Sequence, residues 1–183
     1  MATIHFMHGF IGVGKTTIAK KLAAGEIAGF PNRMVRLNND AWMVRLYGRG
    51  PHDIQAHFDY WRNILSIQWD LMADIIRAGT DVVLDYGTWE KHCRREWHDR
   101  ALKITPNIIF HNVVCDIEVA RARFAARSKS DLAELNTSDE AFNRQLKKYE
   151  PMTDDEGFTV IRHENNADNE HYILCGEEEN AHS

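Results

Sequence analysis

The sequence predicts an α/β domain in which a five-stranded parallel sheet carries helices on both faces. Three observations support this fold class. Short apolar segments recur along the 183 residues, longer segments with helical spacing separate them, and no repeat or linker divides the chain. Strands that alternate with helices imply βαβ units and therefore a parallel sheet.

The first half of the chain begins with residues 3–8, an apolar segment that ends at Gly9 and suits a buried parallel strand. From Lys15 onward apolar residues recur three and four apart, which indicates a helix. Residues 34–37 form the second expected strand, and a long helix is expected at about 53–78 because an apolar stripe repeats there at helical spacing. The members of this stripe are Phe58, Trp61, Leu65, Trp69, Met72 and Ile76.

The second half contains the remaining expected strands, which are residues 81–86, 107–115 and 158–162. Thr88 is expected to cap a helix over about 89–103. Asp116 is expected to cap a further helix, and a capping box at residues 137–140 predicts another that runs to about Glu150.

Composition and charge limit the class of function. The chain is 44% hydrophobic and 27% charged, with a formal net charge of -5, so the basic coat typical of nucleic-acid binders is missing, although a local basic groove remains open. Three cysteines without a CxxC pair, and ten histidines without an HExxH pattern, favour reduced thiols and ordinary core or surface histidines. Without a leader or a long apolar run, we expect a cytoplasmic protein that does not enter a membrane.

The segment from Gly9 to Thr17 fits the phosphate-binding pattern GxxxxGK[ST] at every fixed position, with Gly9, Gly14, Lys15 and Thr16 at those positions. Glycines, here including Gly12, let the backbone N–H groups turn inward around oxygen anions, and the following helix directs its positive end at them. Lys15 would contact the β- and γ-phosphates and Thr16 would bind Mg²⁺. We therefore expect the phosphates of a nucleoside triphosphate at this loop, against residues that include Val13 and Thr17.

Asp85 ends the apolar run Val82-Val83-Leu84 and is a second candidate for holding Mg²⁺, usually through water. The residue after it is Tyr86, where hydrolytic motors usually carry an acidic residue that polarises water. The guanine-reading NKxD motif is also absent from the sequence. These features favour phosphoryl transfer to a bound acceptor over transfer to water.

Two polar residues after the second strand are candidates for contact with the acceptor. Asp40 is expected at the same edge of the sheet as the phosphate loop, where it would accept the acceptor's proton; the alternative is that it only caps the turn that follows. Arg45 would bind the substrate, or it is simply a surface arginine.

Arg123 and Arg127 are four residues apart and share one helix face, followed by a polar stretch. This arrangement is typical of a lid whose arginines close over the transferring phosphoryl group. A solvated basic face explains it equally well on the residues alone.

Several segments together resemble the small P-loop kinases grouped with phage-type polynucleotide kinase, chloramphenicol phosphotransferase and the zeta toxins, proteins often described as AAA-family ATP-binding proteins or predicted kinases. The segments are GFIGVGKTT at 9–17, LNND at 37–40, VVLDYG at 82–87, RARFAAR at 121–127 and YEPMTDDEGFTVI at 149–161. The resemblance implies ATP, Mg²⁺, a base at Asp40 and lid arginines at Arg123 and Arg127. The sequence departs from the group at Arg45, which lies five residues after Asp40, whereas the group commonly has an arginine three residues after this aspartate.

The sequence thus predicts a P-loop NTPase fold in a single kinase domain at residues 1–175, with a lid at about 121–140 and a polar acidic tail at 176–183. The expected activity is transfer of the γ-phosphate of ATP to a hydroxyl of a small molecule. A kinase for polynucleotide 5′ ends and a non-catalytic nucleotide switch or weak ATPase are the alternatives. Neither the acceptor nor the choice between ATP and GTP follows from the sequence.

Overall fold

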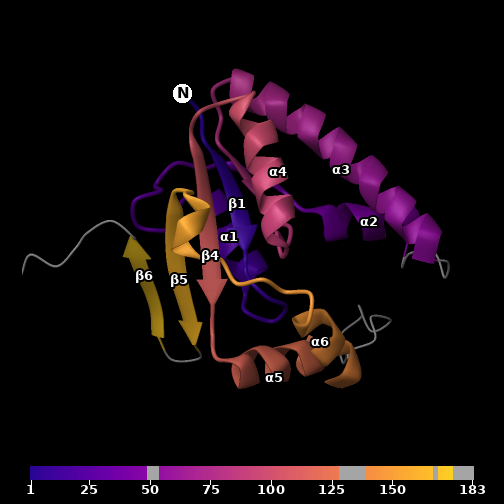
Figure 1. Ribbon diagram of the computed structural model, residues 1–183. Helices are drawn as coiled ribbons and strands as arrows, with labels where there is room; N and C mark the ends of the chain where they lie inside the picture. The colour runs from indigo at the N-terminus through magenta and orange to yellow at the C-terminus, as the bar shows by residue number, and fades with distance from the viewer. Residues whose placement is uncertain (49–53, 128–138, 167–168, 175–183) are drawn as a thin grey trace, which may run out of the picture.

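The computed structural model describes residues 1–48, 54–127, 139–166 and 169–174 (Figure 1). In chain order the elements are β1 (Ile4–His8), α1 (Lys15–Ala24), β2 (Val35–Leu37), α2 (Asn39–Tyr47), α3 (Ile54–Arg77), β3 (Val82–Leu84), α4 (Lys91–Leu102), β4 (Ile108–Val114), α5 (Ile117–Arg127), α6 (Asp139–Leu146), a 3₁₀ turn (Asp154–Glu156), β5 (Val160–Asn166) and β6 (Asn169–Leu174).

The strands form one sheet in the order β2-β3-β1-β4-β5-β6. The first five strands of this order are parallel to their neighbours, and β6 is antiparallel to β5. The five-stranded parallel sheet expected from the sequence is confirmed. The sixth strand was not expected, because its first residues, Asn169, Glu170 and His171, carry no apolar pattern.

Helices cover both faces of the sheet, because the central strands point apolar side chains in alternate directions. Ile4 and Phe6 of β1 face α3 and α4, where they pack in one cluster with Trp69 and Met72. Met7 faces the other way and packs with residues of α1 such as Leu22. In Figure 1, α5 and α6 lie beyond the carboxyl ends of β4 and β5, and contacts such as Phe124 on Phe142, 5.5 Å between ring centroids, join the two helices.

Several details of the helices differ from expectation. Thr88 does not cap α4: it is buried, its hydroxyl donates to the carbonyl of Met7 at 3.3 Å, and Glu90 occupies the N-cap position. The apolar stripe predicted on α3 includes one residue that is not buried, since Phe58 is 53% exposed. The helix α6 ends at Leu146, four residues before the expected end, and the first two residues of its predicted capping box lie outside the described residues. Within the described ranges, no helix is both long and apolar enough to span a membrane.

Candidate nucleotide and acceptor site

The phosphate loop connects the carboxyl end of β1 to the first turn of α1. Gly14 is the N-cap of α1 with φ 97°, no side chain caps the helix, and no acidic residue occupies its first turn. The positive end of the helix therefore faces the loop interior, as an anion site requires.

At two positions of this loop, both the lack of space for a side chain and the backbone φ angle require glycine. A Cβ on Gly12 would lie 2.2 Å from the carbonyl oxygen of Ala120, and one on Gly14 would lie 2.1 Å from Nδ2 of Asn165. Both also have positive φ, 84° and 97°. The loop thus approaches α5 and β5 so closely that only glycine fits at these positions.

The side chains of the loop residues Lys15, Thr16 and Thr17 follow the turn at Gly14. Lys15 Nζ donates to the carbonyl of Phe10 at 2.7 Å, which draws the ammonium back across the loop. Gly9 and Val13 are buried, whereas Thr17 is exposed and Thr16 is partly exposed.

Thr16 and Asp85 are brought together, with the threonine hydroxyl donating to Oδ1 of the aspartate at 3.2 Å. Asp85 is 4% exposed. Its other oxygen, Oδ2, accepts from Nε of Arg36 at 2.9 Å and from Nδ2 of Asn38 at 2.7 Å. Arg36 and Asn38 thus orient the carboxylate so that Oδ1 faces the phosphate loop.

The sequence analysis did not identify Arg36 or Asn38 as site residues. Arg36 lies on β2 and Asn38 directly follows this strand, whose residue Leu37 pairs with Leu84. Their contact with Asp85 therefore follows from strand register, which no local motif encodes. A hydroxyl and a carboxylate oxygen in contact are the hard oxygen donors that Mg²⁺ prefers. The pair Thr16 and Asp85 therefore fits a magnesium ion delivered with nucleotide phosphates.

The candidate acceptor residues lie on α2. Asn38 caps this helix, since its Oδ1 accepts from the N–H of Ala41 at 2.6 Å. The alternative that Asp40 is the cap is therefore wrong: Asp40 lies in the first turn and is exposed. It is two residues from Asn38, which contacts Asp85. Arg45 lies in the last turn and is exposed.

Of the two proposed lid arginines, only one has a described side chain. Arg123 donates to the backbone carbonyl of Asn165 at 3.0 Å, and the side chain of Asn165 donates to the carbonyl of Val13 at 2.7 Å. Arg123 is thereby linked to the rim of the phosphate loop. Arg127 ends α5, but its side chain and residues 128–138 of the predicted lid lie outside the described part.

A buried histidine connects the strand before the loop to the segment after α6. His8 Nδ1 lies 2.7 Å from the carbonyl oxygen of Thr88, so this nitrogen carries the proton and Nε2 accepts. Tyr149 therefore donates its hydroxyl to Nε2 at 3.1 Å, and the two rings stack. Burial lowers the pKa of His8 to about 4 and raises that of Tyr149 to about 12, so both are neutral at pH 7.

Arg94 fixes the same region from α4, and the sequence analysis did not identify this structural role. It is fully buried and forms a two-pronged ion pair with Glu156, at 2.7 and 2.6 Å. It also donates to the carbonyls of Thr88, Trp89 and Glu150. The guanidinium therefore joins the loop after β3 to the segment that returns from α6.

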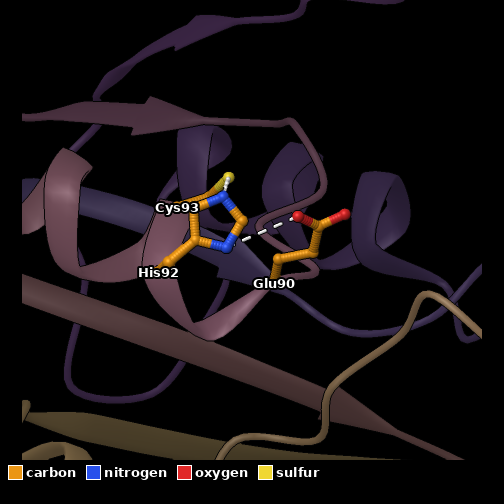
Figure 2. Close-up of side chains that lie close together, drawn as sticks. All are labelled: Glu90, His92 and Cys93. Atoms are coloured by element: carbon orange, nitrogen blue, oxygen red, sulfur yellow. Dashed lines mark hydrogen bonds and ion pairs between the residues drawn. The ribbon is translucent and has the colours of Figure 1, made fainter.

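A cluster of possible metal ligands lies at the start of α4. One ligand atom from each of Glu90, His92 and Cys93 lies within 4.8 Å of the others. Figure 2 shows the imidazole between its two neighbours, with Nδ1 at 3.5 Å from the carboxylate of Glu90 and Nε2 at 3.3 Å from the thiol of Cys93. The two partners contact different ring nitrogens, and such groups are common at exposed positions without an ion, so we assign no metal here.

The fold and the site together define a P-loop nucleotide-binding protein. The model of the AAA domain family matches residues 4–152, which is most of the chain, so the protein belongs to that family. No curated protein matches the sequence.

Solved structures share the fold at low sequence identity. A proposed kinase from Chloroflexus aurantiacus J-10-fl has a TM-score of 0.69 and 16% identity over 91% of this chain and 89% of its own. Kti12 from Chaetomium thermophilum, in complex with ADP-AlF3, has a TM-score of 0.59 and 19% identity over 82% and 81%. A sugar kinase from Janibacter sp. HTCC2649 has a TM-score of 0.54 and 21% identity over 88% of this chain and 86% of its own. These similarities establish the fold.

Proposed function

We propose that the protein is an ATP-dependent kinase that transfers the γ-phosphate to a hydroxyl of a small-molecule acceptor. The observation that carries this proposal is the contact of Thr16 with Asp85 beside a complete phosphate loop. The residue after Asp85 is Tyr86, whose side chain is buried in the core. The position after Asp85 thus offers no carboxylate to activate water, which favours an acceptor hydroxyl as the nucleophile.

Each proposed role follows from charge and position. The loop N–H groups and Lys15 hold the β- and γ-phosphates, and Thr16 with Asp85 would hold Mg²⁺, which neutralises charge that develops between these phosphates. The acceptor oxygen forms a bond to the γ-phosphorus, the bond from that phosphorus to the bridging oxygen breaks, and Asp40 takes the hydroxyl proton. Arg123, linked through Asn165 to the loop rim, would stabilise the transferring group as the lid closes.

The test is a screen of acceptors with ATP labelled in the γ-phosphate, run with the wild-type protein and with Lys15→Ala. The acceptors are monosaccharides, nucleosides, aminoglycosides and 5′-hydroxyl oligonucleotides. The proposal predicts that label moves onto a small acceptor and that Lys15→Ala prevents this. Label that appears only as inorganic phosphate would identify a weak ATPase or a nucleotide switch, and label on oligonucleotides alone would identify a polynucleotide kinase.

A further inference from the structure

Two buried amide side chains beside the site have no hydrogen-bond partner among the residues that the structure describes. Asn39 on α2 is 1% exposed and Gln68 on α3 is 0% exposed, and in both residues neither the amide nitrogen nor the amide oxygen is bonded. The buried hydroxyl of Tyr86 is also unbonded. Native proteins rarely leave such groups unsatisfied, because a buried polar group that loses water without gaining a partner is destabilising.

These three residues lie on the same side of the sheet. Asn39 and Met43 form the buried face of α2, which packs against α3. Tyr86 belongs to the core cluster on the α3 side, together with Met72, which lies one helical turn after Gln68 on the same face of α3. The unbonded polar atoms of all three residues therefore lie on the side of the sheet that α3 covers.

This position is next to the reacting groups. Asn39 stands between Asn38, which binds the carboxylate of Asp85, and Asp40, the proposed base. Tyr86 directly follows Asp85. In open α/β sheets, ligands bind outside the carboxyl ends of the strands, which is where Asn39 and Tyr86 lie.

The three polar side chains are uncharged, and Tyr86 lies against aromatic rings, with the charges of Asp85 and Arg100 nearby. An amide offers both a donor and an acceptor, and the phenol of Tyr86 stays neutral because burial raises its pKa. Trp97 packs edge-on against Tyr86 at 5.6 Å and against Trp69 at 6.3 Å. The guanidinium of Arg100 is already stacked on Trp69, 4.3 Å from the ring centroid. A charged ligand group buried among these atoms would be costly to desolvate.

We propose that Asn39, Gln68 and Tyr86 bind the acceptor, and that the acceptor is an uncharged molecule rich in hydroxyl groups, with the chemistry of a sugar or a nucleoside. This inference rests on the proposed kinase function and names its substrate class. Because both amides are enclosed, the acceptor reaches them only when α2 shifts on α3. Binding should therefore change hydrogen exchange in α2 and the facing turns of α3.

The test compares Gln68→Met with wild type, because methionine keeps the size of the side chain and removes its polar atoms. The matched control is Gln55→Met on the exposed surface of the same helix. Probes are uncharged monosaccharides and nucleosides on one arm, and sugar phosphates, nucleotides and 5′-hydroxyl oligonucleotides on the other. We expect Gln68→Met to raise the KM for an uncharged acceptor at least about tenfold, with the KM for ATP unchanged and the melting temperature equal to or above that of the wild type. Gln55→Met should change none of these.

The outcomes separate this inference from the kinase proposal. Transfer to charged acceptors alone would overturn the inference and leave the kinase function standing, as would an unchanged acceptor KM in Gln68→Met, which would mean that internal water satisfies the amides. If no acceptor is phosphorylated, the kinase proposal fails. The proposed binding site is then tested by the melting temperature with nucleotide present. A shift that a sugar or nucleoside causes in the wild type and not in Gln68→Met supports the site, and the absence of any shift overturns it.

Discussion

The phosphate side and the acceptor side of the site differ in how their polar atoms are satisfied. On the phosphate side, Lys15, Thr16 and Asp85 all have hydrogen-bond partners within the protein. On the proposed acceptor side, Asn39 and Gln68 are buried without any partner in the described part of the chain. A phosphate chain is the same in every nucleotide, so its site can be fully organised by the chain itself. A site that selects one acceptor requires polar atoms that only this acceptor satisfies.

Phosphoryl transfer should be more sensitive to a single substitution on the phosphate side than to one on the proposed acceptor side. Replacing Lys15 with Ala removes the charge that the motif directs at the β- and γ-phosphates, and we expect phosphoryl transfer to fall by at least about 10²–10³-fold. Lys20→Ala, on the exposed surface of the same helix, is the control and should retain activity. Near-normal turnover of Lys15→Ala would show that the loop does not bind the phosphates as described.

The buried ion pair of Arg94 and Glu156 should contribute strongly to the free energy of unfolding. Arg94→Met leaves the carboxylate of Glu156 buried without its charged partner, which should lower the free energy of unfolding by about 3–5 kcal/mol in urea denaturation. The double variant Arg94→Met with Glu156→Gln should recover part of that loss, because the uncompensated charge is gone. A loss below about 1 kcal/mol in the single variant would mean that Arg94 does not hold this segment.

Acid should destabilise the protein through its buried histidines. Burial lowers the pKa of His5 and His163 to about 4, and both bond to the buried His111, at 2.9 and 2.7 Å. Because these folded-state pKa values lie below the ordinary 6.5, the stability is complete above pH 6.5 and is lost as pH falls towards 4, by up to about 3 kcal/mol per histidine.

Chemical denaturation between pH 7.5 and 4.5 measures this loss. His163→Gln should flatten the pH dependence, whereas a change at the exposed His92 should not. A free energy of unfolding that stays constant across this range would show that these histidines are not buried in their neutral form.

The magnesium dependence should change least. Asp85→Asn keeps the shape of the side chain but removes its charge, so the Mg²⁺ concentration for half-maximal transfer should rise about tenfold. Affinity for nucleotide without metal should change less. Asp99→Asn, at an exposed position on α4, is the control. An unchanged magnesium curve for Asp85→Asn would remove this carboxylate from the metal site.

The phosphate loop and Asp85 could be proposed from the sequence because their signals are local. The spacing from Gly9 to Thr16 and the apolar run before Asp85 can be found without knowing which strands are neighbours. The five parallel strands were predictable for the same reason, since each is a short apolar segment between polar or glycine residues. The polar start of β6 gave no such signal.

The remaining features depend on contacts between distant segments. Arg36 reaches Asp85 only because β2 pairs with β3, and Arg94 reaches Glu156 across 62 positions of sequence. Thr88 resembled a helix cap because nothing in its neighbours shows that its hydroxyl is directed to Met7 on β1. The amides of Asn39 and Gln68 became notable only when their burial was known.

The measurement that tests the account most directly is phosphoryl transfer by Asp40→Asn, together with ATP affinity and melting temperature. Asp40 is exposed and Asn38 caps the helix, so the variant should fold and melt as the wild type does. As the base for the acceptor hydroxyl, Asp40 should contribute about 10²–10⁴-fold to transfer while ATP affinity stays unchanged. Normal transfer, or a loss of ATP affinity that accompanies the loss of transfer, would contradict a kinase in which the acceptor side supplies the base.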